Sequence, residues 1–183
     1  MARLLIASFL LAITCAALPA KAQTGQLAVW PEEPDGFKGI QFGWTEKQSK
    51  SVVHWARPGC FPFKGSRLCT MLIDGGGFTI TAYFTFDANG FSMATGHFPS
   101  GNYEAVRDMF VAKYGEPHHA DQSWVQNGMG ATFQQEDLSW SGTHVHIALS
   151  RFGTTVTEGF FGIGTLAGWE ADHEKAAREK ALQ

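Results

Sequence analysis

The sequence predicts an exported α+β protein in which antiparallel sheet packs against two main helices and one disulfide closes a short loop. Residues 78–86 alternate between apolar and polar side chains, which is typical of a strand with one buried face. Residues 103–114 repeat apolar side chains at spacings of three and four, which predicts a helix with one apolar stripe. The third observation is a close pair of cysteines, Cys60 and Cys69. A hairpin and a helix that each have one apolar face bury those faces by packing together.

Residues 1–22 have the pattern of a secretory signal peptide. Arg3 is followed by an apolar run from Leu4 to Leu18, and Ala20-Lys21-Ala22 has the small-x-small form of a cleavage site. The run is too short for a membrane span, and no later segment approaches one. We therefore expect a periplasmic or secreted protein. Lipid anchoring through Cys15 is the alternative, although the residues before it match a lipidation site poorly.

Removal of the signal peptide leaves a chain of acidic character. The peptide carries two of the 14 basic residues and none of the 17 acidic ones, so the remainder has a net charge of 12 − 17 = −5. Such a surface disfavours nucleic acid and anionic membrane as partners. Cys60 and Cys69 then remain as the cysteine pair, and an oxidising compartment favours a disulfide between them.

The order of elements predicts one folded domain from residue 37 to 165. Residues 23–36 form an irregular lead-in with Trp30 as a candidate anchor, and residues 166–183 form a C-terminal helix or tail. Thr45 and Gln48 have the spacing of a capping box, and the helix that they start is expected to bring Val52, Val53 and Trp55 to the core. Each main helix precedes a run of antiparallel strands, which raises the possibility of two related helix-plus-sheet units.

Two short motifs at the helix ends resemble a known group of proteins. Phe42-Gly43-x-Thr45 precedes the first helix, and Tyr114-Gly115-Glu116-Pro117 ends the second. In these motifs the chain is similar to small exported bacterial proteins of the OmlA-like (outer-membrane assembly lipoprotein) and β-lactamase-inhibitor-like group. The resemblance implies a protein-binding module without catalysis, in which a helix ending in a Gly-x-Pro turn packs on antiparallel sheet. It covers the helix entries and exits, carries over no inhibitory residue, and departs from the OmlA-like pattern at the lipidation site.

A protein-contact surface is the function that the residues themselves favour. The segment between the cysteines presents Phe61 and Phe63 beside Lys64 and Arg67, and aromatic residues next to arginine on a rigid frame are typical of interface hot spots. The alternative is that both phenylalanines turn inward and fill the end of the sheet. A second candidate surface is the sheet face that carries Thr79, Thr81, Tyr83 and Thr85, which would otherwise be a plain solvated face.

Two other functions were weighed against a binding module. His144 and His146 lie two residues apart on one predicted strand, so both could reach a metal ion, with His118, His119 and Asp121 as further candidates; the alternative is a solvated polar strand face. A hydrolase is the third possibility, but the chain has neither a Gly-x-Ser-x-Gly elbow nor a His-Glu-x-x-His motif. The sequence therefore predicts a non-enzymatic exported module that binds another envelope or secreted protein, with no cofactor.

Overall fold

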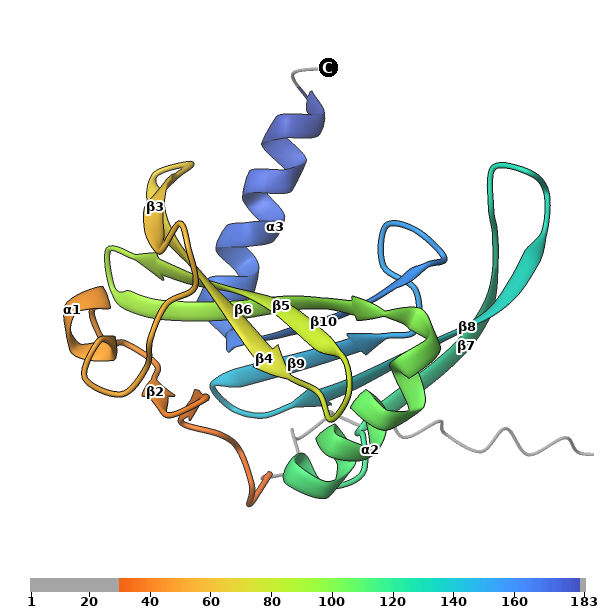
Figure 1. Ribbon diagram of the computed structural model, residues 1–183, viewed down its shortest axis with the longest axis horizontal. Helices are drawn as coiled ribbons and strands as arrows, with labels where there is room; N and C mark the ends of the chain where they lie inside the picture. The colour runs from red at the N-terminus through yellow and green to blue at the C-terminus, as the bar shows by residue number, and fades with distance from the viewer. Residues whose placement is uncertain (1–29, 182–183) are drawn as a thin grey trace, which may run out of the picture.

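The computed structural model describes residues 30–181, and the predicted signal peptide lies outside this range. Within this range, six strands precede helix α2 and four follow it (Figure 1). In chain order, the elements are β1 (Gly36–Phe37), β2 (Ile40–Gln41), α1 (Glu46–Ser49), β3 (Cys60–Phe63), β4 (Ser66–Asp74), β5 (Thr79–Asp87), β6 (Gly90–Pro99), a 3-10 turn (Ser100–Asn102), α2 (Tyr103–Tyr114), β7 (His119–Gln126), β8 (Thr132–Ser141), β9 (Val145–Ser150), β10 (Glu158–Thr165) and α3 (Leu166–Ala181).

Strands β3 to β10 form one eight-stranded antiparallel sheet. Its strand order is β3-β4-β5-β6-β10-β9-β8-β7, so two four-stranded meanders meet at their last strands, β6 and β10. The predicted α+β class, with antiparallel sheet and a Cys60–Cys69 disulfide, is confirmed. Each meander is preceded by a helix, α1 or α2, and a common origin of the two units stays a prediction.

The core lies between α2 and one face of the sheet, which we call the core face. The predicted apolar stripe is confirmed, because all four of its residues are buried: Tyr103, Val106, Phe110 and Tyr114. The Phe110 ring lies 5.4 Å from that of Phe161 on β10 and 6.1 Å from that of Trp140 on β8. Strand β5 turns Ile80, Phe84 and Phe86 toward the same core. The apolar faces of the hairpin and the helix therefore belong to one buried core, in which the Phe84 ring packs on Phe37 and Trp55.

The prediction of two main helices is not confirmed, because α1 is a single turn. Thr45 and Gln48 do form the predicted capping box. The helix nevertheless ends at Ser49, whose hydroxyl donates to the Glu46 carbonyl at 2.7 Å, while the Ser51 hydroxyl donates to the Gln48 carbonyl at 2.7 Å. These side chains occupy carbonyls that a continued helix needs. Val52 is consequently 49% exposed and is not the predicted core residue, whereas Val53 and Trp55 pack against the core.

The lead-in is held against the bottom of the sheet by two of its residues. Trp30 is 7% exposed, and its indole nitrogen donates to the carbonyl of Tyr114 at 3.2 Å. The Glu33 carboxylate accepts backbone N–H groups of the β8–β9 turn, at 3.1 Å from Thr143, 2.5 Å from His144 and 2.7 Å from Val145. Burial raises the pKa of Glu33, but these backbone hydrogen bonds outweigh burial and lower it. Beyond this contact, residues 36–41 form the small β1–β2 hairpin.

Candidate functional site

The face of the sheet opposite α2, which we call the outer face, is covered within residues 30–181 by α3, and only at one end. Helix α3 rises from this face beside the β3–β4 hairpin (Figure 1). Its first turn is fixed by the Thr165 hydroxyl, which accepts the Gly168 N–H at 3.0 Å, and by Trp169, whose ring lies directly over Gly162. The Trp169 indole nitrogen also donates to the carbonyl of His146 at 2.9 Å. The rest of the outer face of β5 and β6 is thus left open. Helix α3 and the β3–β4 hairpin stand on either side of this face at one end, and we call these two elements the walls.

Three adjacent hollows follow this open face, and we refer to them together as the trough. Their volumes are about 320, 290 and 580 Å³. The first two share five lining residues, and the last two share Tyr83, so the hollows are continuous. The trough runs from α3 and the β3–β4 hairpin to the ends of β5 and β6 near Thr79 and Pro99.

Hydroxyl and aromatic side chains form the floor of the trough. They are the alternate residues of β5 and β6, with one from β10: Thr79, Thr81, Tyr83, Thr85, Thr95, His97 and Phe160. The His97 ring lies 6.5 Å from that of Tyr83 and 5.6 Å from that of Phe160. Among the described residues, the buried Nδ1 of His97 has no hydrogen-bond partner. Besides His97 and the Tyr83 phenol, this part of the trough is lined by the carboxylate of Glu158 on β10, at the end away from α3, so the middle of the floor suits an uncharged polar ligand.

The two walls meet through cation–π contacts. The Lys175 ammonium of α3 lies 5.5 Å from the centroid of the Phe63 ring at the tip of the β3–β4 hairpin, and Lys64 lies 5.4 Å from the same ring. Phe63 is still 43% exposed, so part of its ring faces the trough. Asp172 lines the trough beside Lys175, and the charges at this end are therefore mixed.

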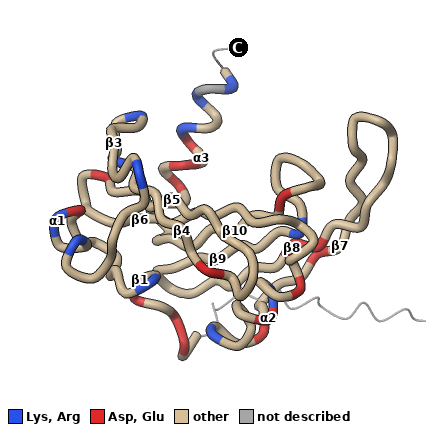
Figure 2. The backbone as a smooth tube through the Cα atoms, in the orientation of Figure 1, with Lys and Arg blue, Asp and Glu red and all other residues tan. Residues whose placement is uncertain are grey.

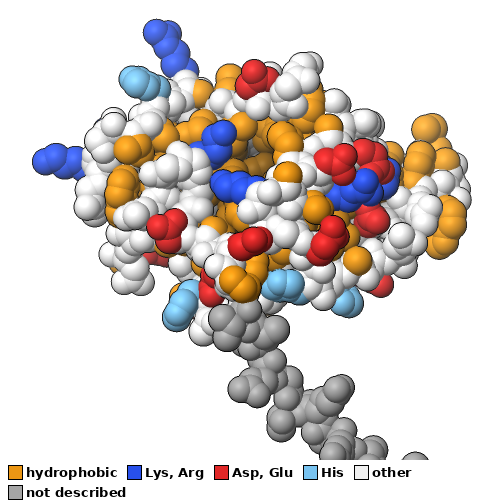
Figure 3. Space-filling model, turned by 90° about the horizontal axis from the view of Figure 1, so that it is seen from below, with side chains coloured by type: hydrophobic (Ala, Val, Ile, Leu, Met, Phe, Trp, Pro, Cys, Tyr) orange, Lys and Arg blue, Asp and Glu red, His pale blue; other side chains and the backbone are white. Residues whose placement is uncertain are grey.

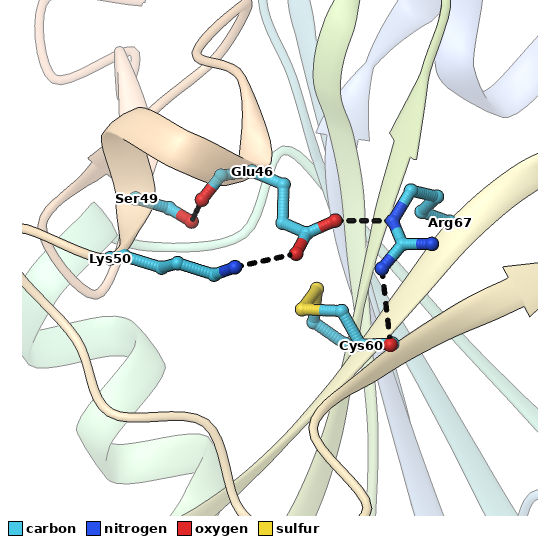
Figure 4. The surroundings of a disulfide bond; sticks show 6 residues. Glu46, Ser49, Lys50, Cys60 and Arg67 are labelled. Atoms are coloured by element: carbon cyan, nitrogen blue, oxygen red, sulfur yellow. Dashed lines mark hydrogen bonds and ion pairs between the residues drawn. A yellow bond between two sulfur atoms is a disulfide. The ribbon is translucent and has the colours of Figure 1, made fainter.

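The predicted contact residues divide between the two faces of the hairpin. Phe63 and Lys64 line the trough, and Phe61 is half-buried opposite Leu68, which also lines it. Arg67 points the other way, toward α1, where it pairs with Glu46 and donates to the Cys60 carbonyl at 3.1 Å (Figure 4). The hydrogen bond from Arg67, with a further one from Lys50, lowers the pKa of Glu46 despite burial. Arg67 thus holds the base of the hairpin, beside the disulfide, and lies outside the trough.

The two predicted metal ligands occupy different surroundings. His144 lies in the exposed β8–β9 turn, before β9 begins at Val145. His146 is half-buried, with its Nδ1 2.9 Å from the Ser141 hydroxyl and its ring 5.2 Å from that of Trp169. Burial, with a contribution from His173, lowers the pKa of His146, so its imidazole is neutral at pH 7. Metal binding by this pair stays a prediction.

A group of potential ligands does occur elsewhere in the described part of the chain. Glu46, Cys60 and Cys69 place their ligand atoms within 4.8 Å of one another. The two sulfurs are bonded to each other, however, and a thiolate is the form of cysteine that binds metal. This cluster is therefore a structural brace at the base of the hairpin.

Hydrolase chemistry has one candidate pair, Ser141 and His146. Their contact at 2.9 Å is the geometry of a nucleophile and its base. Among the described residues, no carboxylate forms a hydrogen bond or ion pair with His146 to orient it as a third member would. The pair also lies outside the trough. We therefore regard this contact as part of the packing beneath α3.

Sequence reasoning found one strand of the floor and one wall, and missed the rest. The alternating threonines of β5 and the β3–β4 hairpin were both identified as candidate surfaces. Thr95, His97 and Phe160 were missed, although β6 has an alternating pattern that would have placed Thr95 and His97 on one face. Lys175 was missed because nothing in the sequence of α3 shows that it returns to the hairpin.

Comparison of the chain with protein-family models, with curated proteins and with solved structures finds no match. The resemblance to OmlA-like and β-lactamase-inhibitor-like proteins therefore stays a prediction. Within residues 30–181, no helix is both long and apolar enough to cross a membrane. That finding and the disulfide are compatible with an exported protein.

Proposed function

We propose that this chain is a non-enzymatic, exported binding module that holds a segment of another envelope or secreted protein in the trough. The observation that carries this proposal is the continuity of the three hollows over a sheet face whose hydroxyls and aromatic rings are left uncovered by the elements of residues 30–181. Helix α3 and the β3–β4 hairpin flank this face at one end, so a bound segment would be enclosed from two sides there. The core face, by contrast, is covered by α2 together with residues 30–55.

The shape of the trough favours an extended peptide over a compact small molecule. Small-molecule sites enclose most of their ligand, whereas these hollows form a line along β5 and β6. Alternate residues on a strand stand about 6.6 Å apart, which is also the repeat of side chains on one side of an extended peptide. The hydroxyls of Thr79, Thr81 and Thr85 can therefore meet successive polar groups of such a segment.

The charges on the walls define the kind of segment. The threonine hydroxyls and aromatic rings between Glu158 and α3 offer no opposite charge, so a charged group placed there would lose hydration without a partner. Lys175 and Asp172 stand at the α3 end, where a segment bearing either charge would find an opposite one. We infer a mainly uncharged, polar segment that contributes an aromatic or aliphatic side chain against Tyr83 and Phe63.

Site-specific photo-crosslinking in envelope preparations tests this function. A photoreactive amino acid at Thr95, on the floor, is expected to capture a discrete partner protein. The same amino acid at Met109 is the matched control, because Met109 is 42% exposed but lies on α2, on the other side of the sheet. Equal capture from both positions, or none from Thr95 in a folded protein, would rule out the trough as the binding site.

Two substitutions then measure the contribution of the walls and floor. Tyr83→Ala and Phe63→Ala are each expected to weaken partner binding about tenfold or more, since aromatic anchors contribute about 1–3 kcal/mol when truncated. Met109→Ala is expected to leave binding unchanged. Near-ultraviolet circular dichroism of each variant shows that a loss of binding does not reflect a loss of fold.

A further inference from the structure

The β7–β8 hairpin extends beyond the body of the protein as a projecting arm (Figure 1). We define the arm as residues 122–135, a stretch with no charged residue, which Figure 2 shows as an uninterrupted tan loop. Hydrophobic side chains gather at the corresponding end of the molecule in Figure 3. Trp124 is 72% exposed and Met129 is 91% exposed. An exposed tryptophan on an uncharged projection is typical of an interaction surface.

The arm is ordered by its own hydrogen bonds. At the tip, the Asn127 side chain accepts the N–H of Met129 at 3.1 Å and that of Ala131 at 2.9 Å. At the base, the Gln135 side chain pairs with the backbone of Phe152, accepting its N–H at 2.9 Å and donating to its carbonyl at 3.0 Å. The Phe133 ring packs 5.9 Å from that of Phe152. A contact made by this arm therefore costs little conformational entropy.

The two edges of the sheet differ in how they are protected. Strand β3 is four residues long, contains Pro62, and is followed at once by Lys64, which are features that prevent edge-to-edge pairing. Strand β7 is eight residues long and contains neither proline nor lysine, and seven of its residues are exposed. Its unpaired backbone groups thus form an open template for another strand.

We propose that β7 is the contact between two copies of this chain, which pair antiparallel about a two-fold axis and join their sheets edge to edge. An isologous contact of this kind places the same strand on both sides. The second copy fits because its arm is uncharged in the same stretch, although the two molecules as wholes carry like net charge. The arm thus keeps the charges of the two bodies away from the contact.

The central register of the pairing avoids opposed like charges. With the axis at Ser123, Gln122 of one copy faces Trp124 of the other, and Ala120 faces Gln126. Asp121, the nearest charge, then faces Val125 and not its own counterpart. A slip that centres the pairing on Asp121 opposes two carboxylates, which is destabilising. The Ser123-centred register therefore pairs residues 120–126 of the two copies without opposing like charges.

The pairing of two β7 edges predicts both the affinity of the dimer and the orientation of its two troughs. One strand edge with its side chains buries less than the ~1,600 Å² of a standard interface, so dissociation in the micromolar range is expected. A two-fold axis perpendicular to the joined sheets keeps both outer faces on the same side. If the trough binds as proposed above, the dimer presents two troughs to one partner surface, which raises the overall affinity.

Sedimentation analysis with a charge-exchange pair tests the dimer. The exported form is expected to show a concentration-dependent monomer–dimer equilibrium. Ser123→Lys and Ser123→Glu each place like charges at the axis, so each variant alone is expected to remain monomeric, with the dissociation constant of the dimer raised at least about tenfold. An equimolar mixture of the two variants is expected to dimerise again.

Ser51→Lys is the matched control, because Ser51 is exposed but lies beyond α1, and its self-association is expected to equal that of the wild type. A wild-type protein that stays monomeric through the high-micromolar range overturns the proposal. Dimers that persist in both single variants, or a mixture that does not associate, overturn it as well. Because restoration in the mixture requires folded partners, it also excludes misfolding as the cause of the monomeric variants. This outcome is independent of whether the trough captures a partner.

Discussion

Replacement of Trp169 by alanine is expected to release α3 from the outer face while the sheet stays folded. The Trp169 ring lies so close over Gly162 that a Cβ there would come within 2.5 Å of it. The same ring contacts His146 edge-on at a centroid distance of 5.2 Å. Most other residues of α3 between 170 and 181 are exposed, so this side chain carries most of the attachment of the helix.

The expected magnitude comes from two contributions. Removal of the ring exposes about 100 Å² of apolar surface, which corresponds to about 2.5 kcal/mol at ~25 cal/mol per Å². Loss of the hydrogen bond to the His146 carbonyl adds about 0.5–1 kcal/mol. The sum of about 3 kcal/mol corresponds to a ~150-fold increase in the population of the detached helix.

Hydrogen–deuterium exchange measures this population directly, because amides of α3 exchange through local opening. Exchange over residues 169–175 is expected to accelerate by about 100-fold in Trp169→Ala, with β5 and β6 unchanged. Trp169→Phe keeps the packing and loses the hydrogen bond, so a roughly fivefold effect is expected. Glu170→Ala, at an exposed neighbouring position, serves as the control.

Exchange in Trp169→Ala at nearly the wild-type rate would refute the role of this ring in holding α3. Uniform acceleration across the whole sheet would refute the claim that the effect is local. In either case the wall of the trough would have to be held by another contact, of which the Lys175–Phe63 pair is the candidate.

Two further predictions concern the sheet and its lead-in. Glu33→Gln is expected to lower the melting temperature at pH 7. Because the folded pKa of Glu33 is lowered, the difference from wild type should shrink as the pH falls below the ordinary pKa of a glutamate and vanish below the folded pKa, which thermal melts at a series of pH values measure. A melting difference that stays constant down to pH 2 would contradict this assignment. Gly96→Ala places a Cβ within 2.1 Å of the Phe161 ring. This substitution is expected to lower the free energy of unfolding, measured with urea, by about 1–3 kcal/mol. Gly101→Ala is the control that is expected to have no effect, because a Cβ there meets no atom within 4 Å.

Several local features of the fold could be predicted because they depend on short stretches of chain. The alternating residues of β5 and the apolar stripe of α2 each lie where the sequence pattern places them. The capping box and the disulfide follow from residue types at fixed separations. In these cases the direction of a side chain is set by its own backbone, so neighbours in sequence suffice.

Errors arose where side chains competed with the backbone or where distant segments met. The length of α1 was overestimated because the hydroxyls of Ser49 and Ser51 bond to helix carbonyls. The role of Glu33 was missed because its three partners lie more than a hundred residues away in the sequence. No periodicity records such a contact.

The candidate site shows the same division. The sequence by itself determined that β5 has a threonine-rich face and that the segment around Phe63 is braced by a disulfide. Tertiary structure decided that these two features lie on the same side of the sheet, that Trp169 holds α3 beside them, and that the uncharged hairpin projects as an arm. The physical reason is that strand pairing and burial are settled by the whole chain, since each strand finds its neighbours through contacts far apart in sequence.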